Sequence, residues 1–156
     1  MSVQDNKELL RRFFNILNAH KLERLDEVCD TDFVYHSNAG EHHEGLDDFK
    51  TNMNQGFQGL PDMELSMEEL AAEGDKVYCV YRWTGTHKGD LLGIPPSNQK
   101  VDIMVNTVVT CRDGKITDMY DFYDAMTMLQ QIGAVSDEVR PGGRDWPTGG
   151  TTLRPQ

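Results

Sequence analysis

The sequence predicts an α+β fold in which helices cover one face of a curved, mainly antiparallel sheet. Apolar residues recur at helical spacing in three segments before Pro61, whereas turn signals and alternating side chains mark strands from Met63 to Tyr123. A short helical pattern follows the last strand. Helices followed by a run of antiparallel strands are typical of α+β domains with a helix-covered sheet.

Four segments carry the apolar stripes expected of helices. The first and third are long, at residues 6 to 19 and 46 to 60, and a shorter second helix is predicted at residues 22 to 28. The last runs from Ala125 to about Ile132, with Asp124 placed as its N-cap.

Turns and loops divide the remaining sequence into strands. The turn EGD at residues 73 to 75, the loop LLGIPPSNQ at 91 to 99 and the turn RDG at 112 to 114 separate four consecutive strands. The segment FVYH at residues 33 to 36 is a short strand or an extended bridge.

One domain accounts for the length of the chain. Its 156 residues are 38% hydrophobic, which is enough for one core and too little for two ordinary domains. We assign this domain to residues 1–135. Residues 136–156 include PGGRDWPTGGTTLRPQ, whose Gly and Pro content predicts a tail without regular structure, anchored only by Trp146.

Charge and hydropathy exclude several classes of protein. The chain has 15 basic and 26 acidic residues, a net charge of −11, and its basic residues are scattered, so we expect no nucleic-acid partner. No apolar run approaches a membrane span, and the N-terminus has no signal pattern. The three cysteines form no CxxC pair, which fits a reducing compartment. We expect a cytoplasmic protein without membrane association.

The segment DMYDFYD contains a carboxylate in an unusual position. Strand alternation puts Met119, Asp121 and Tyr123 on one face. Asp124 is explained as a helix cap, but Asp121 lies mid-strand between aromatic residues. In an apolar pocket its pKa would rise, which suits proton transfer. The alternative is a buried structural aspartate bonded to a backbone amide or to Arg82.

Several stretches resemble successive blocks of the SnoaL-like polyketide cyclase family, within the nuclear-transport-factor-two-like superfamily. They fall between about residues 6 and 135 and include NKELLRRFFN, DFVYHS, GLDDFK, GTHKGDLLGIPPSNQK and RDGKITDMYDFYDAMTMLQQIG. The resemblance implies a cone-shaped α+β barrel, usually dimeric through its outer sheet face, with a cofactor-free pocket. It also implies an aspartate general acid/base on the last strand, which falls on Asp121.

Four further residues are candidates for the site. His36 matches a histidine common in the family and is predicted to orient the substrate or Asp121, or else to be structural. His87, in GTHKG, is a weaker candidate with a structural or dimer role as the alternative. Arg82 interrupts an apolar strand and is predicted to hold a substrate oxygen, or else to lie on the outer face and meet an acidic group across an interface. Thr107 replaces a histidine of some relatives; its hydroxyl can stabilise an oxyanion but cannot exchange protons near neutral pH.

Aromatic and methionine side chains are expected to shape the pocket, namely Phe14, Phe49, Met53, Phe57, Trp83 and Tyr123. We predict no metal site, because His36, His42 and His43 in HSNAGEHHEG lack a recognised ligand spacing. Nucleotide-binding patterns are absent from the sequence, so no cofactor is expected.

The leading prediction is a cofactor-free cyclase or isomerase for a hydrophobic, carbonyl-bearing, polyketide-like molecule, with Asp121 transferring the proton. An epoxide-hydrolase-like alternative uses Arg82, Asp102 and Asp121 around a water. A second alternative is a non-catalytic ligand-binding module. An Asp121 carboxylate facing an enclosed cavity would favour an enzyme. Because the strand at residues 76 to 87 is apolar on both faces, we also predict a homodimer through the sheet.

Overall fold

The structure is a computed structural model that describes residues 1–138; Trp146 and the expected tail beyond residue 138 lie outside the described residues. The helices are α1 (Val3–Asn18), the 3-10 helix η1 (Leu22–Glu27), α2 (Leu46–Gly59) and α3 (Ala125–Gln131). The strands are β1 (Cys29–Ser37), β2 (His42–Glu44), β3 (Glu64–Glu73), β4 (Lys76–Thr86), β5 (Lys100–Arg112) and β6 (Lys115–Tyr123).

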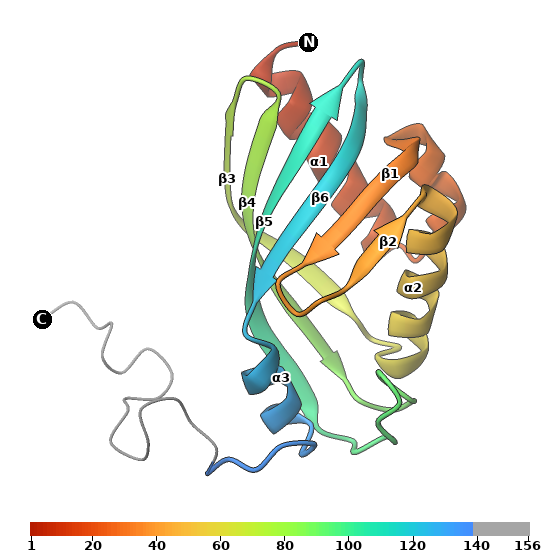
Figure 1. Ribbon diagram of the computed structural model, residues 1–156, viewed down its shortest axis with the longest axis vertical. Helices are drawn as coiled ribbons and strands as arrows, with labels where there is room; N and C mark the ends of the chain where they lie inside the picture. Colours follow the sequence, from red (N-terminus) through yellow and green to blue (C-terminus); the bar gives the residue numbers. More distant parts are fainter. Residues whose placement is uncertain (139–156) are drawn as a thin grey trace, which may run out of the picture.

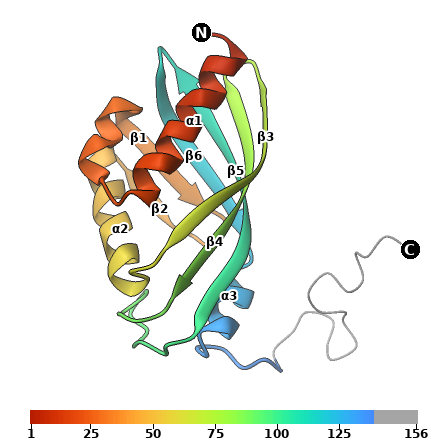
Figure 2. The ribbon, with the colours of Figure 1, turned by 180° about the vertical axis from the view of Figure 1, so that it is seen from behind.

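One curved sheet contains all six strands, in the order β2-β1-β6-β5-β4-β3 (Figure 1). Every neighbouring pair is antiparallel except β1 and β6, which are parallel. The predicted α+β class and mainly antiparallel sheet are therefore confirmed. The curved sheet wraps around helices, as expected for the cone-shaped fold, and it does not close on itself because the edge strands β2 and β3 do not pair. Instead, α1 packs on β3 and α2 packs on β2, so helices fill the space between the edges (Figure 2).

The predicted elements differ from the structure mainly between residues 22 and 44. The expected second helix is only a 3-10 helix, and β1 begins at Cys29 instead of Phe33. An irregularity separates the pair of Cys29 with Ile116 from the regular register that resumes at Val34. The polar sequence CDTD has no alternation that could have predicted this extension. β2 forms inside the expected loop because it pairs with β1.

The core lies between the helices and the concave face of the sheet. Phe13 from α1 and Phe33 from β1 are fully buried, and the ring of Phe49 from α2 lies 6.1 and 5.0 Å from theirs. All three cysteines are buried and unpaired, so they pack as small apolar residues. No helix within residues 1–138 is both long and apolar enough to cross a membrane.

The predicted cap at the start of α3 is also present. The Asp124 carboxylate accepts a hydrogen bond from the backbone N–H of Thr127 at 3.0 Å. Gly133 follows the helix in a left-handed conformation, with φ of 77°, the conformation that commonly ends a helix. α3 is thereby fixed directly after the strand that carries Asp121.

The loop between β4 and β5 is held against the end of α2. The fully buried His87 accepts a hydrogen bond at Nδ1 from the backbone N–H of Ser97, so its Nε2–H donates to the Ile94 carbonyl. The Gly59 carbonyl accepts from the backbone N–H of Gly89 at 3.1 Å, and a Cβ on Gly89 would lie 2.1 Å from the Gln58 carbonyl oxygen. A side chain at residue 89 would therefore push the loop off the helix.

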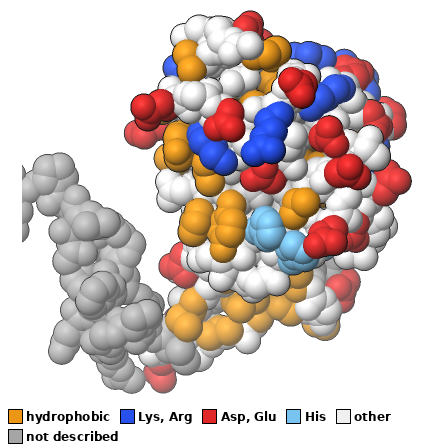
Figure 3. Space-filling model, turned by 45° about the horizontal axis from the view of Figure 1, so that its top comes forward, with side chains coloured by type: hydrophobic (Ala, Val, Ile, Leu, Met, Phe, Trp, Pro, Cys, Tyr) orange, Lys and Arg blue, Asp and Glu red, His pale blue; other side chains and the backbone are white. Residues whose placement is uncertain are grey.

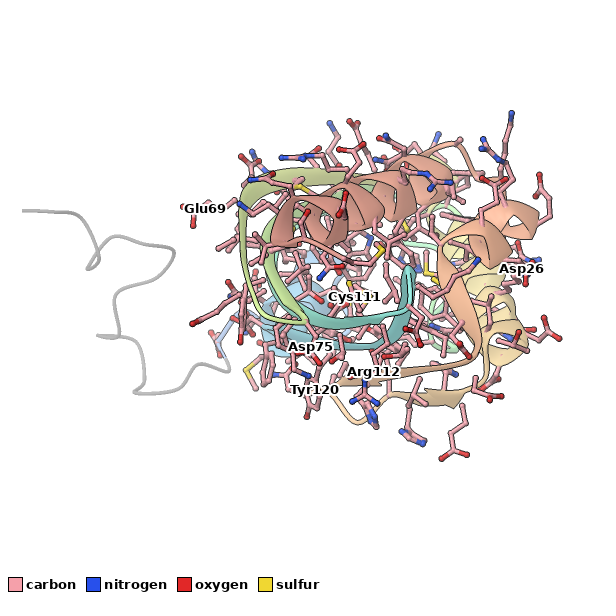
Figure 4. All side chains as sticks on the ribbon, turned by 90° about the horizontal axis from the view of Figure 1, so that it is seen from above. Asp26, Glu69, Asp75, Cys111, Arg112 and Tyr120 are labelled. Atoms are coloured by element: carbon pink, nitrogen blue, oxygen red, sulfur yellow. The ribbon has the colours of Figure 1, made fainter. Side chains whose placement is uncertain are left out.

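The convex face of the sheet carries exposed apolar side chains. Phe122 is 48% exposed and stacks on Tyr120 at 4.5 Å, and Met104 on β5 and Tyr78 on β4 are about half exposed. Figure 4 shows Tyr120 on the outer side of the curved sheet, and Figure 3 shows hydrophobic side chains gathered beside histidines on this face. An apolar patch of this kind is typical of an interaction surface.

We predict that this outer face pairs with a second copy of the chain. Sedimentation velocity at micromolar concentration should give about twice the 17.7 kDa of one chain. Phe122→Glu should shift the protein towards monomer, because it places a charge in the apolar contact. Leu92→Glu is the matched control, since Leu92 is exposed on the β4–β5 loop. A wild-type monomer under these conditions would contradict the prediction.

Candidate active site

A cavity of about 580 Å³ opens between the helices and the concave face of the sheet. Its walls include inward-facing side chains of β4, β5 and β6, the inner faces of α1 and α2, and residues 89 to 93 of the β4–β5 loop. A volume of this size suits a small organic molecule. The tight contact of Gly89 with α2 therefore shapes one wall of the cavity.

Asp121 lies in the wall of this cavity with one carboxylate oxygen held in place. Strand alternation turns Met119, Asp121 and Tyr123 inward, as predicted, and Asp121 is only 4% exposed. Its Oδ2 accepts hydrogen bonds from the phenol hydroxyls of Tyr35 at 3.0 Å and Tyr81 at 2.8 Å. The two tyrosines come from β1 and β4, on opposite sides of β6, so the carboxylate is fixed from two directions.

The second oxygen of Asp121 is buried but unpaired. Among the described residues, nothing hydrogen-bonds to Oδ1. The Thr107 hydroxyl, on the neighbouring strand, donates instead to the backbone carbonyl of Tyr120 at 3.2 Å. An unpaired buried carboxylate oxygen costs about 1 to 3 kcal/mol. Since Asp121 lines the cavity, a bound ligand is the natural partner for this oxygen.

Burial makes Asp121 a weaker acid than an ordinary aspartate. Loss of solvent around the carboxylate raises the pKa of Asp121 to about 6, although the hydrogen bonds from Tyr81 and Tyr35 oppose the rise. Burial also raises the pKa of Tyr35 and of Tyr81 well above the ordinary value, so both stay protonated and act only as donors. Asp121 is therefore the group in this cluster that exchanges a proton near neutral pH.

A second carboxylate, that of Glu41, lines the same cavity. Its Oε2 accepts hydrogen bonds from the Tyr123 hydroxyl at 3.0 Å and the Ser37 hydroxyl at 2.9 Å. The Asn38 side chain holds the backbone of Tyr123 through two hydrogen bonds, at 3.1 and 3.0 Å. Glu41 also contributes to the raised pKa of Asp121 through the repulsion between the two carboxylates.

Comparison with known proteins places the chain in a family. The family model of SnoaL-like polyketide cyclases matches residues 7–132. The chain belongs to the SnoaL-like polyketide cyclase family. Among curated proteins, none matches the sequence.

Solved structures of other proteins share the fold. A proposed SnoaL-like polyketide cyclase from Jannaschia sp. CCS1 is 28% identical, with a TM-score of 0.78 over 85% of this chain and 94% of that one. IdmH, a proposed polyketide cyclase from Streptomyces antibioticus, is 25% identical, with a TM-score of 0.71 over 82% and 98% of the two chains. AclR from Streptomyces galilaeus, described as a proposed hydroxylase, is 24% identical, with a TM-score of 0.77 over 89% and 87%.

Most of the predicted pocket residues of this SnoaL-like protein lie together. Those that line the cavity with Asp121 are Phe14, Phe49, Met53, Trp83 and Tyr123. Phe57 does not, because it lies further round α2 and stacks on His20 with ring centroids 3.9 Å apart. Whether these side chains contact a substrate stays a prediction.

Two predicted site residues lie on the wrong face of the sheet. His36 alternates with the inward-facing Tyr35 and stacks on Tyr120 at 5.6 Å, so it cannot orient Asp121. Arg82 likewise points outward, and its guanidinium forms two hydrogen bonds with Asp102, at 2.6 and 2.7 Å. The hydrolytic alternative is therefore not assembled, because Arg82 and Asp102 lie on the face opposite Asp121.

Thr107 and His87 take structural positions. Thr107 is buried beside Asp121 but is not among the residues that line the cavity, and its hydroxyl is used by the backbone of β6. His87 is enclosed by the loop that it holds. The contacts of His87 therefore fit the structural alternative. Neither Thr107 nor His87 lines the cavity.

Sequence reasoning missed three members of the site, Tyr35, Tyr81 and Glu41. A signal existed for the tyrosines: Tyr81 shares the strand parity of Trp83, which was placed in the pocket, and Tyr35 has the parity opposite to His36. Glu41 had no such signal. It lies between β1 and β2, and only the pairing of β1 with β2 brings it over the cavity.

The raised pKa of Asp121 makes a testable contribution to stability. The native state keeps the Asp121 proton up to about pH 6, whereas an ordinary aspartate has a pKa of 3.8. The free energy of unfolding therefore falls as pH rises from about 3.8 to about 6, because the unfolded chain releases this proton first. Asp121→Asn should therefore gain stability relative to wild type between pH 4 and 7, by on the order of 2 kcal/mol. Urea unfolding at each pH measures the difference.

The matched control for this measurement is Asp118→Asn, which removes a carboxylate from the same strand. Asp118 accepts hydrogen bonds from the hydroxyls of Thr110 and Thr117, at 3.1 and 3.0 Å, away from the Asp121 cluster. A stability difference between Asp121→Asn and wild type that stays constant from pH 4 to 7 would contradict the assignment.

Proposed function

We propose that this protein is a cofactor-free cyclase or isomerase that acts on a hydrophobic, carbonyl-bearing small molecule, with Asp121 as its general acid/base. The observation that carries the proposal is the Asp121 carboxylate, which lines the cavity with one oxygen anchored and the other unpaired. Membership of the SnoaL-like polyketide cyclase family supports a cyclase-type reaction.

The first step is removal of a proton from a carbon next to a carbonyl group. Asp121 Oδ1 accepts the proton, and the electron pair of the broken C–H bond moves into the enolate. A pKa near 6 suits this role, because the group is mostly ionised at neutral pH and still able to return the proton. The apolar walls keep water from competing for the enolate.

The second step determines whether the product is a ring or an isomer. In cyclisation, the enolate carbon attacks a second carbonyl carbon, a C–C bond forms, and the new alkoxide takes the proton from Asp121. In isomerisation, Asp121 returns the proton to a different carbon. Tyr35 and Tyr81 are positioning residues in both cases, because they fix the carboxylate without losing their own protons.

Hydrogen exchange at carbon tests the proposal without knowledge of the substrate. The probe is α-tetralone in D₂O, with loss of its C2 proton signal followed by NMR. Wild-type protein should accelerate the exchange, and Asp121→Asn should reduce the protein-catalysed rate by about a hundredfold to ten-thousandfold, because general acid/base catalysis contributes that much. The rate should rise with pH through about 6 as Asp121 ionises.

Two further results complete the test. Asp118→Asn should exchange the probe at the wild-type rate, since its carboxylate does not line the cavity. An undiminished rate in Asp121→Asn would contradict the proposed mechanism. A wild-type protein that binds α-tetralone without exchanging it would instead favour the non-catalytic ligand-binding module.

A further inference from the structure

Trp83 presents a second unpaired polar atom in the wall of the same cavity. Trp83 lines the cavity, and its indole Nε1 is buried without a hydrogen-bond partner among the described residues. The part of the chain that the structure describes contains two such buried side-chain atoms, Trp83 Nε1 and Asp121 Oδ1, and both belong to cavity-lining residues. Buried polar groups in native proteins are normally paired, so their coincidence in one cavity indicates a shared ligand.

The other buried donors of the cavity are already committed. The hydroxyls of Tyr35 and Tyr81 donate to Asp121, and the hydroxyl of Tyr123 donates to Glu41. Amide side chains on α2 also line the cavity, at Asn52, Gln55 and Gln58, but these residues are partly or fully exposed and can hydrogen-bond to water. The Trp83 indole N–H is thus the buried side-chain donor of this wall that has no partner among the described residues.

The Trp83 ring is held in a defined place. It packs edge-on against Tyr123 at 6.2 Å, and Tyr123 is fixed in turn by Glu41 and Asn38. Trp83 lies two residues along β4 from Tyr81, on the same face, and Tyr81 holds Asp121. Two residues of strand span roughly 7 Å. A ligand of two or three fused rings can therefore reach from Asp121 to Trp83.

The charges around the cavity determine which kind of ligand oxygen can accept a hydrogen bond from Trp83. Three carboxylates line the cavity, those of Glu41, Asp90 and Asp121. Among the described residues, no Lys, Arg or His side chain lines it. A ligand carboxylate would be desolvated against charges of the same sign with no cation to balance it. A neutral carbonyl oxygen accepts the same hydrogen bond without this penalty.

We propose that the Trp83 indole N–H binds a neutral carbonyl oxygen of the ligand, so that the cavity selects uncharged carbonyl-bearing ring systems over both their carboxylates and plain hydrocarbons. This inference rests on the proposed function in one respect, namely that the cavity is the ligand site. It assigns Trp83 as the residue that selects the ligand, separately from the proton transfer by Asp121.

Binding of three tricyclic probes to the full chain tests the inference. Fluorenone has one carbonyl, fluorene has none, and fluorenone-2-carboxylate adds a charge. None of them has a hydrogen on a carbon next to the ketone that Asp121 could remove, so the readout is binding alone. Wild type should bind fluorenone about fivefold more tightly than fluorene, the factor given by one hydrogen bond of about 1 kcal/mol. The carboxylate should bind about tenfold more weakly than fluorenone.

Two variants separate the hydrogen bond from the shape of the cavity. Trp83→Phe keeps an aromatic wall and removes the donor, so it should lose the preference for fluorenone while binding fluorene as wild type does. Tyr78→Phe is the control, because Tyr78 lies on the same strand as Trp83 but is half exposed and does not line the cavity, and it should keep the preference. A preference that survives in Trp83→Phe, or a carboxylate that binds as well as fluorenone, would overturn the proposal.

A measurement on the wild-type protein covers the case in which Trp83→Phe fails to fold. In a ¹⁵N-labelled sample, the Trp83 indole proton should move downfield with fluorenone and not with fluorene; the Trp146→Phe variant assigns the two indole signals. An unmoved Trp83 signal at saturating fluorenone would overturn the proposal and leave the Asp121 mechanism standing. Failure of both fluorene and fluorenone to bind would contradict the ligand site itself, and with it the proposed function.

Discussion

A carboxylate buried between two phenol hydroxyls is the interaction on which the rest of this structure depends. Desolvation of Asp121 is unfavourable, and the hydrogen bonds from Tyr35 and Tyr81 offset only part of that cost. The three residues come from β6, β1 and β4. They meet only if β1 runs parallel to β6 in the observed register and if the sheet curves enough for Tyr81 to reach across β5.

Small side chains on the sheet make room for that reach. Asp121 pairs across the sheet with Thr107 on β5, which pairs with Cys79 on β4. Neither side chain is large enough to separate the Tyr81 phenol from the carboxylate. Fully buried aromatic residues at Phe13 and Phe33 fill the other part of the concave face, so the cavity and the core divide the space between them.

Stability and function are in opposition at this site. An ionised Asp121 and an unpaired Trp83 indole are both unfavourable in the empty protein. Unfavourable features that are concentrated in one cavity are expected where a ligand completes the interactions. The outer face shows a different arrangement, since Arg82 and Asp102 form an ion pair with each other there.

Much of the fold could be predicted from local patterns, because alternation and helical spacing report which face of an element is buried. Parity predicted that Asp121 shares a face with Met119 and Tyr123, and the start of the helical pattern predicted the cap at Asp124. The parallel pairing of β1 with β6 joins residues far apart in the sequence, which no local pattern encodes, and β2 forms in a polar segment without the alternation of a strand. Parity put His36 and Tyr35 on opposite faces of β1, but it did not show which of the two faces lines the cavity.

Direct titration of the Asp121 side chain tests the central claim. In full-length protein with ¹³C-labelled aspartate, the Cγ signal of Asp121, assigned by its loss in Asp121→Asn, should titrate with a pKa of about 6. Removal of a donor in Tyr81→Phe should move this pKa higher, because the ionised form loses a hydrogen bond. An Asp121 carboxyl that titrates near 3.8, the ordinary value, would contradict the account.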